Sequence, residues 1–86
     1  MKYNFSISLR QGLDPDAKFI KSFGFADTYD EAMQKAFDVI NDPNNENELR
    51  CKSLYVRIIE FKKNECVGLD YGSYSRFIIV KKQEIN

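Results

Sequence analysis

Residues 2–10 alternate between polar and apolar side chains, and this pattern limits the fold more than any other part of the sequence. Alternation with a period of two is typical of a β-strand with one buried face, because successive strand side chains point to opposite sides of a sheet. The apolar positions are Tyr3, Phe5, Ile7 and Leu9, and the polar positions are Lys2, Asn4, Ser6, Ser8 and Arg10. We therefore expect an antiparallel sheet whose apolar face is covered by another layer.

A second strand is expected over residues 17–25, after a loop marked by Gly12 and Pro15. Three phenylalanines share one register in this strand: Phe19, Phe23 and Phe25. Lys21 falls in the same register. Either a bulge near Gly24 shifts the phase of the strand, or Lys21 is an inward-pointing charge that protects an edge strand from pairing with other chains. We favour the edge-strand interpretation.

The motif TYDE, at residues 28–31, predicts the start of a helix. It is a capping box, in which the Thr28 hydroxyl accepts a hydrogen bond from the Glu31 amide and the Glu31 side chain reaches back. Apolar residues then recur on one side of the helix: Tyr29, Ala32, Met33, Ala36 and Ile40. A helix with one apolar stripe packs on a sheet. Pro43 ends the helix, and residues 41–50 are expected to form a polar loop.

The C-terminal half contains three further strand-like segments. Residues 52–62 are apolar on both faces, which is typical of a central strand, and residues 66–71 and 74–82 follow as strands joined by a tight turn at 70–73. Hairpins can join all of these strands antiparallel to one another. The sequence thus predicts an α+β domain with an antiparallel sheet of four to five strands, ordered ββαββ or ββαβββ, and one amphipathic helix packed on one face.

Length and composition place the chain in the globular class. A single domain spanning residues 1–86 is expected, and 13 basic residues balance 13 acidic ones, so no global field attracts DNA or an anionic membrane. No apolar run approaches the ~18 residues of a membrane span, and residues 1–10 lack the apolar block of a signal peptide. A cytoplasmic location is therefore expected. Cys51 and Cys66 would lie at opposite ends of one strand, too far apart for a disulfide, so we expect free thiols.

The sequence offers little for catalysis. It contains no histidine, which removes the Ser-His and Cys-His nucleophile pairs and the commonest zinc ligand. The glycine motifs that hold phosphates are absent, and the run from Asp42 has Asn47 and Ser53 where a calcium loop needs glycine and glutamate. Neither an enzyme nor a metal or cofactor site is expected. An active site or a small-ligand site would require a pocket lined by Cys66 or Asp70.

Binding is the remaining class of function. The C-terminal strands combine tyrosines with arginines in a candidate binding patch: Tyr55, Arg57, Tyr71, Tyr74 and Arg76. Tyrosine and arginine are frequent at the hot spots of protein interfaces, and the same residue types hold single-stranded nucleic acid by stacking and by phosphate contacts. A plainer interpretation is that the tyrosines border the core and the charges keep edge strands soluble.

Zero net charge favours a protein partner over nucleic acid. The expected function is a small non-catalytic module that binds a protein partner, with single-stranded nucleic-acid binding as the alternative. Homodimerisation through the uncovered sheet face or an edge strand is a further expectation. The residue usage, rich in Lys, Asn, Ile, Tyr and Phe, would suit an accessory protein of a phage or mobile element that acts by occlusion, although this is an association and not a mechanism.

Overall fold

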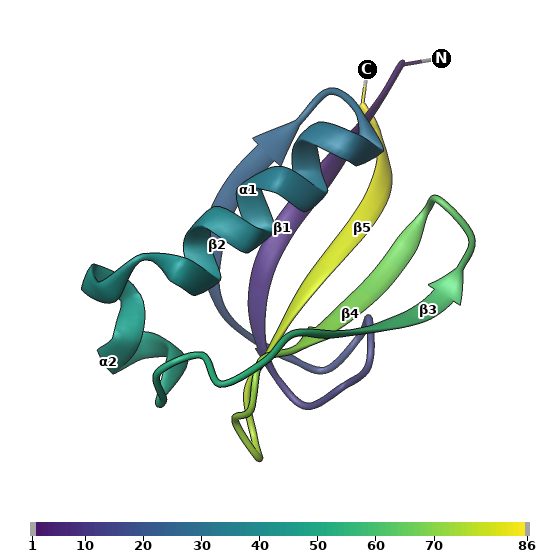
Figure 1. Ribbon diagram of the computed structural model, residues 1–86. Coiled ribbons are helices and arrows are strands. Elements are labelled where there is room, and N and C mark those ends of the chain that lie inside the picture. The colour runs from purple at the N-terminus through teal and green to yellow at the C-terminus, as the bar shows by residue number, and fades with distance from the viewer. Residues whose placement is uncertain (1, 86) are drawn as a thin grey trace.

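The computed structural model describes residues 2–85, and its centre is a five-stranded antiparallel sheet (Figure 1). The strands are β1 (Lys2–Gln11), β2 (Lys18–Ala26), β3 (Arg57–Lys62), β4 (Cys66–Asp70) and β5 (Phe77–Ile85). Their order across the sheet is β2-β1-β5-β4-β3, and all neighbouring strands run antiparallel. The predicted α+β fold with an antiparallel sheet is confirmed.

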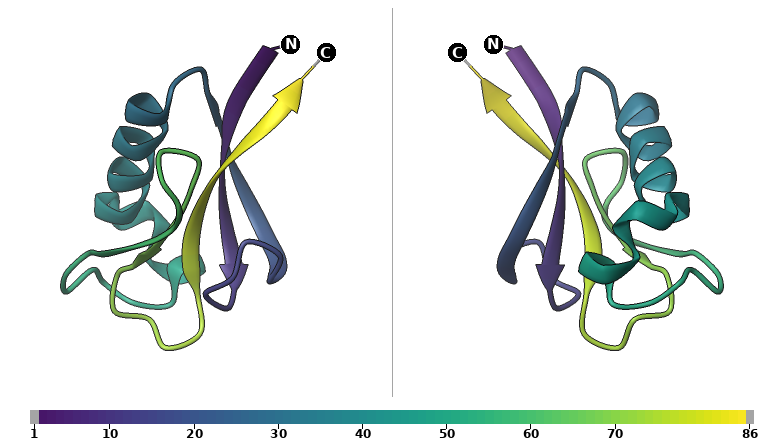
Figure 2. Two further views of the ribbon diagram at one scale, coloured as in Figure 1. Left: turned by 90° about the vertical axis from the view of Figure 1, so that its right-hand side faces the viewer. Right: turned by 90° about the vertical axis from the view of Figure 1, so that its left-hand side faces the viewer.

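The main helix, α1 (Tyr29–Asn41), packs across β1, β2 and β5 on one side of the sheet (Figure 2). Thr28 caps it as predicted, because its Oγ1 accepts a hydrogen bond from the Glu31 amide at 3.2 Å. The predicted apolar stripe faces the sheet, with Ala32, Ala36 and Ile40 buried. This layer forms because the stripe and the apolar face of β1 remove each other from water.

The prediction of a loop over residues 41–50 was wrong, because most of this segment is helical. A 3-10 turn (Pro43–Asn45) leads into a second short helix, α2 (Glu46–Leu49), so the protein has two α-helices in the part that the structure describes. The Asp42 carboxylate accepts a hydrogen bond from the Asn44 amide at 2.9 Å, which starts the turn. Leu49 then enters the core with only 1% of its surface exposed. Burial of this apolar side chain is one of the contacts that hold the segment against the protein.

The core lies between the sheet and α1. Cross-strand neighbours such as Ile7 and Val80, or Leu9 and Ile78, point to the same side because they are directly paired in the antiparallel register. The largest fully buried side chains of this core come from β1, β4, β5, α2 and residue 71 after β4: Ile7, Leu9, Val67, Leu69, Ile78, Val80, Leu49 and Tyr71. Ile79 is equally buried but lies on the other side of the sheet, beside Gly68.

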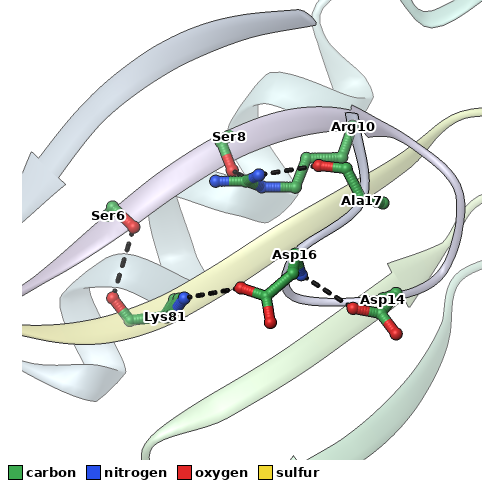
Figure 3. A network of polar contacts seen from close by, with 7 residues as sticks. All are labelled: Ser6, Ser8, Arg10, Asp14, Asp16, Ala17 and Lys81. Carbon is green, nitrogen blue, oxygen red and sulfur yellow. Dashed lines mark hydrogen bonds and ion pairs between the residues drawn. The ribbon is translucent and has the colours of Figure 1, made fainter. Parts of the chain in front are cut away.

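The opposite side of the sheet is partly covered by the connection between β1 and β2 (Figure 3). Arg10 Nη1 donates to the Ala17 carbonyl at 2.8 Å, and Lys81 Nζ pairs with Asp16 Oδ1 at 3.4 Å. Leu13 of the same connection packs over Gly68, where an added methyl group would lie 2.6 Å from Leu13 Cδ1. The face that α1 leaves uncovered therefore carries a polar network and a small apolar cluster.

The two edges of the sheet differ. β2 is an edge strand as expected, and its register against β1 shifts in two places, one of them around Gly24, so the bulge and the edge both occur. Lys21 on this edge forms an ion pair with Glu48 of α2 at 2.8 Å. The prediction of a central strand over residues 52–62 was wrong, because β3 begins only at Arg57 and forms the other edge.

Candidate binding clefts at one end of the sheet

Three connections meet at the end of the sheet opposite the chain termini (Figures 1 and 2). They are the β1–β2 connection, the segment 50–56 between α2 and β3, and the β4–β5 connection at 71–76. Gln11 is the last residue of β1, and Arg57 and Phe77 are the first residues of β3 and β5. The antiparallel pairing therefore places all three at this end of the sheet. All five residues of the predicted patch come from this end of the molecule.

A cleft of about 400 Å³ lies between the segment 50–56 and the β4–β5 connection. We name it the aromatic cleft, and its side chains include Leu13, Leu54, Tyr55, Arg57, Asp70, Ser73, Tyr74 and Phe77. Tyr74 is fully exposed at the tip of its connection, and Tyr55 and Leu54 are 53% and 78% exposed. Tyr55, Arg57 and Tyr74 of the predicted patch are thus brought together here, although Tyr74 precedes β5, which begins at Phe77.

Within residues 2–85, Arg57 and Asp70 are the only charged residues that line the aromatic cleft, and they neutralise each other. Arg57 Nη2 lies 3.0 Å from Asp70 Oδ2 across the β3–β4 ladder. The other oxygen of Asp70 accepts the Gly72 amide at 3.0 Å, and the residue is only 6% exposed. A buried carboxylate with these partners is fixed in place, and it holds the arginine close to the cleft wall.

Tyr71 does not reach the surface. Its side chain is fully buried, and its hydroxyl donates a hydrogen bond to the Leu49 carbonyl at 2.7 Å. Burial raises the pKa of the Tyr71 phenol well above its usual range, so the group stays protonated and keeps donating. Arg76 acts beside it, because its Nη1 donates to the Glu48 carbonyl at 2.6 Å. The two side chains satisfy consecutive carbonyls at the C-terminal end of α2 and attach that helix to the β4–β5 connection.

A second cleft, of about 520 Å³, lies on the other side of the β4–β5 connection. We name it the arginine cleft, and its lining includes Gln11, Arg50, Cys51, Ser73, Tyr74, Ser75 and Arg76. Ser73 and Tyr74 line both clefts, so the connection is the wall between them. Sequence reasoning missed Arg50, since nothing in the sequence near it indicates that α2 ends there and turns the chain.

Neither thiol is activated. Burial raises the pKa of Cys66, although the nearby Lys81 acts in the opposite direction, and burial together with the Asp70 carboxylate raises the pKa of Cys51. A thiol with a raised pKa is a weak nucleophile near neutral pH. Both cysteines are free, as expected. Among the residues described, no three His, Cys, Asp or Glu side chains gather as a metal site would require, and no helix is long and apolar enough to cross a membrane.

Comparison with protein-family models, curated proteins and solved structures finds no match to this chain. The two clefts are therefore the features of the molecule from which a function can be inferred.

Proposed function

We propose that the protein is a non-catalytic module that binds a protein partner through the aromatic cleft. The observation that supports this proposal is the exposure of Leu54, Tyr55 and Tyr74 around one hollow, beside a neutral ion pair. Monomeric proteins seldom leave such side chains gathered on their surface without a use for them, and tyrosine and arginine contribute most to binding at protein interfaces. A module of this kind acts by occlusion, because it covers a surface of its partner.

Single-stranded nucleic acid is supported less well. Phosphate binding along a strand needs several available cations beside the stacking side chains. Of the two arginines in the predicted patch, Arg57 is paired with Asp70, so only Arg76, which is bonded to the uncharged Glu48 carbonyl, has no carboxylate partner within residues 2–85. The net charge of zero adds no general attraction.

The decisive comparison is between Tyr55→Ser/Tyr74→Ser and the control Tyr3→Ser. Tyr3 is 46% exposed, close to the 53% of Tyr55, and lies on β1 outside both clefts, so the control removes a partly exposed ring elsewhere. We would capture a binding protein from a native extract with the wild type, purify it and measure its affinity for each variant by calorimetry. The double variant is expected to bind about tenfold or more weakly, since two hot-spot side chains are lost, while Tyr3→Ser binds as the wild type.

Equal affinity for both variants would exclude the aromatic cleft as the interface. The mass in solution, measured by light scattering, tests the homodimer separately. A wild-type dimer that the double variant dissociates would make a second copy of the chain the partner.

A further inference from the structure

We infer that the arginine cleft is an oxyanion-binding site, which receives a phosphate or a carboxylate group carried by the protein partner. This inference deepens the proposed function and depends on it for the nature of the partner. The binding of an oxyanion as such depends only on the cleft, which is separate from the aromatic cleft and shares one wall with it.

Two arginines line the arginine cleft, and no aspartate or glutamate lines it. Arg50 is exposed and has no hydrogen-bond or ion-pair partner for its side chain within residues 2–85. Arg76 is partly buried, and its one described side-chain bond goes to the uncharged Glu48 carbonyl. A partly buried cation without a counter-ion is costly, and an oxyanion in the cleft would supply the missing charge.

The carboxylates around the cleft are engaged elsewhere. Asp70 pairs with Arg57 inside the aromatic cleft, and the side chain of Glu48 pairs with Lys21 on β2. Glu46 shares a smaller neighbouring hollow with Arg50, but the two side chains form no ion pair in the part of the chain that is described. The Cys51 thiol adds no negative charge, because burial raises its pKa.

The remaining lining groups can donate hydrogen bonds to an oxyanion. Tyr74, Ser75 and Gln11 also line the cleft, and neither the two hydroxyls nor the side-chain amide of Gln11 has a described partner. Guanidinium forks and hydroxyls are the donors that hold phosphate and carboxylate groups in proteins.

The guanidinium of Arg76 and the backbone of Arg50 are held in position before any ligand arrives. Arg76 is attached at both ends, since its backbone amide donates to Ser73 Oγ at 3.1 Å and its guanidinium to the Glu48 carbonyl at 2.6 Å. Arg50 ends α2 with a left-handed backbone (φ 72°), which directs the chain away from the helix at the rim of the cleft. Positions fixed in advance lower the entropic cost of binding.

The size of the cleft and its shared wall define the ligand further. A volume of about 520 Å³ is larger than a single phosphate group and within the range of ligand pockets. Tyr74 lines both clefts, so one stretch of partner could place an apolar side chain in the aromatic cleft and an anionic group beside Arg50 and Arg76. The partner that fits is a protein segment with a phosphorylated or acidic residue next to an apolar one.

The test uses the ¹⁵N-labelled protein, titrated separately with inorganic phosphate and with acetate at constant ionic strength set by chloride. We expect saturable shifts of the Arg50, Cys51, Ser75 and Arg76 amides. If only phosphate produces these shifts, the partner carries a phosphorylated residue. If only acetate produces them, the partner carries an acidic residue or a chain terminus. Either result supports an oxyanion site. Arg50→Gln should weaken the binding about tenfold, while Arg50→Lys retains most of it.

The matched control is Lys63→Gln, which removes one exposed cation in the β3–β4 turn, outside both clefts, and should leave the binding unchanged. No saturable shift at these amides in the wild type would overturn the oxyanion site, as would equal weakening by Arg50→Gln and Lys63→Gln. Titration with an oligothymidine separates the two proposals. Tight binding that falls steeply with salt would overturn the protein partner and leave the oxyanion site standing.

Discussion

The hydroxyl of Tyr71 holds α2 to the sheet, and its removal is the simplest residue-level test of that role. Tyr71→Phe leaves the ring in the core but leaves the Leu49 carbonyl without its donor at 2.7 Å. We expect a loss of about 1 to 2 kcal/mol in the free energy of unfolding, because a buried acceptor is left unsatisfied. Chemical denaturation followed by circular dichroism measures this loss.

Tyr74→Phe is the control for this substitution. It removes the same hydroxyl from a side chain that is fully exposed, so its effect should stay within about 0.5 kcal/mol. Equal unfolding midpoints for the two variants would mean that Tyr71 does not stabilise the attachment of α2.

The raised pKa of Tyr71 also predicts a dependence on pH. In the unfolded chain this phenol has its ordinary pKa of 10.0, whereas burial raises the pKa in the folded protein. As the pH rises above the unfolded pKa of 10.0, the unfolded chain releases the Tyr71 proton before the folded protein does, so the free energy of unfolding falls. Below pH 10.0, the contribution of the protonated Tyr71 to the free energy of unfolding is fully present. Tyr71→Phe should therefore lose less stability than the wild type between neutral pH and pH values above 10.0, as measured by urea unfolding at each pH.

Residue types alone could not show which members of the predicted patch are exposed and which are buried or bonded to the backbone. Tyrosine and arginine can be recognised as binding residues in a sequence, but their availability depends on which acceptors lie near them. The acceptors of Tyr71 and Arg76 are carbonyls of α2, a helix that the sequence did not predict. Arg50 was missed for the same reason, since it reaches the arginine cleft only because α2 ends there.

At the scale of elements, the start of α1 depends on Thr28. Its Oγ1 accepts the Glu31 amide at 3.2 Å, and the side chain of Glu31 makes no described bond back to Thr28, so the hydroxyl is the main contribution of this cap. Thr28→Ala should lower the free energy of unfolding by about 1 kcal/mol. Thr28→Ser keeps the acceptor and should change it much less. Thermal unfolding followed by circular dichroism compares the two, and equal losses would contradict a capping role.

The elements that could be predicted are those with local signals. β1, β2 and α1 follow from a period of two and a capping motif, both of which involve residues close together in the sequence. α2 could not be predicted, because a helix of four residues depends on the burial of Leu49 and on side chains from the β4–β5 connection. Single helical turns have no stability of their own.

The position of β3 was predicted wrongly because the apolar residues of the segment 52–62 lie in two different surroundings. Phe61 packs on the side of Gly68 that faces Leu13 of the β1–β2 connection, while Leu54 and Tyr55 line the aromatic cleft before the strand begins. In the sequence these residues form one continuous apolar run. Only the long-range contacts distinguish this mostly exposed edge strand from a central strand.

At the scale of the whole molecule, the first and last strands are neighbours in the middle of the sheet. β1 and β5 pair from Lys2 with Ile85 to Arg10 with Phe77, while β3, at the edge, pairs with β4 alone. Ile7 and Val80 lie opposite each other in this central pair, and both are fully buried. The core is therefore complete only after the two ends of the chain have met, and such distant pairing is typical of slow folding.

This topology predicts a gradient of hydrogen exchange across the sheet. The amides of β1 and β5 that take part in the ladder around Ile7 and Val80 can exchange only when the whole protein unfolds, whereas β3 can separate from β4 without disturbing the core beneath α1. We expect β3 to open with a free energy at least about 2 kcal/mol below that of β1 and β5, as measured by exchange into deuterium oxide with NMR detection. Tyr71→Phe should lower the values for β1 and β5 by the same amount as its measured loss of stability. Equal protection of β3 and β1 would instead mean that the sheet opens as one unit, so that both clefts exist only in the fully folded protein.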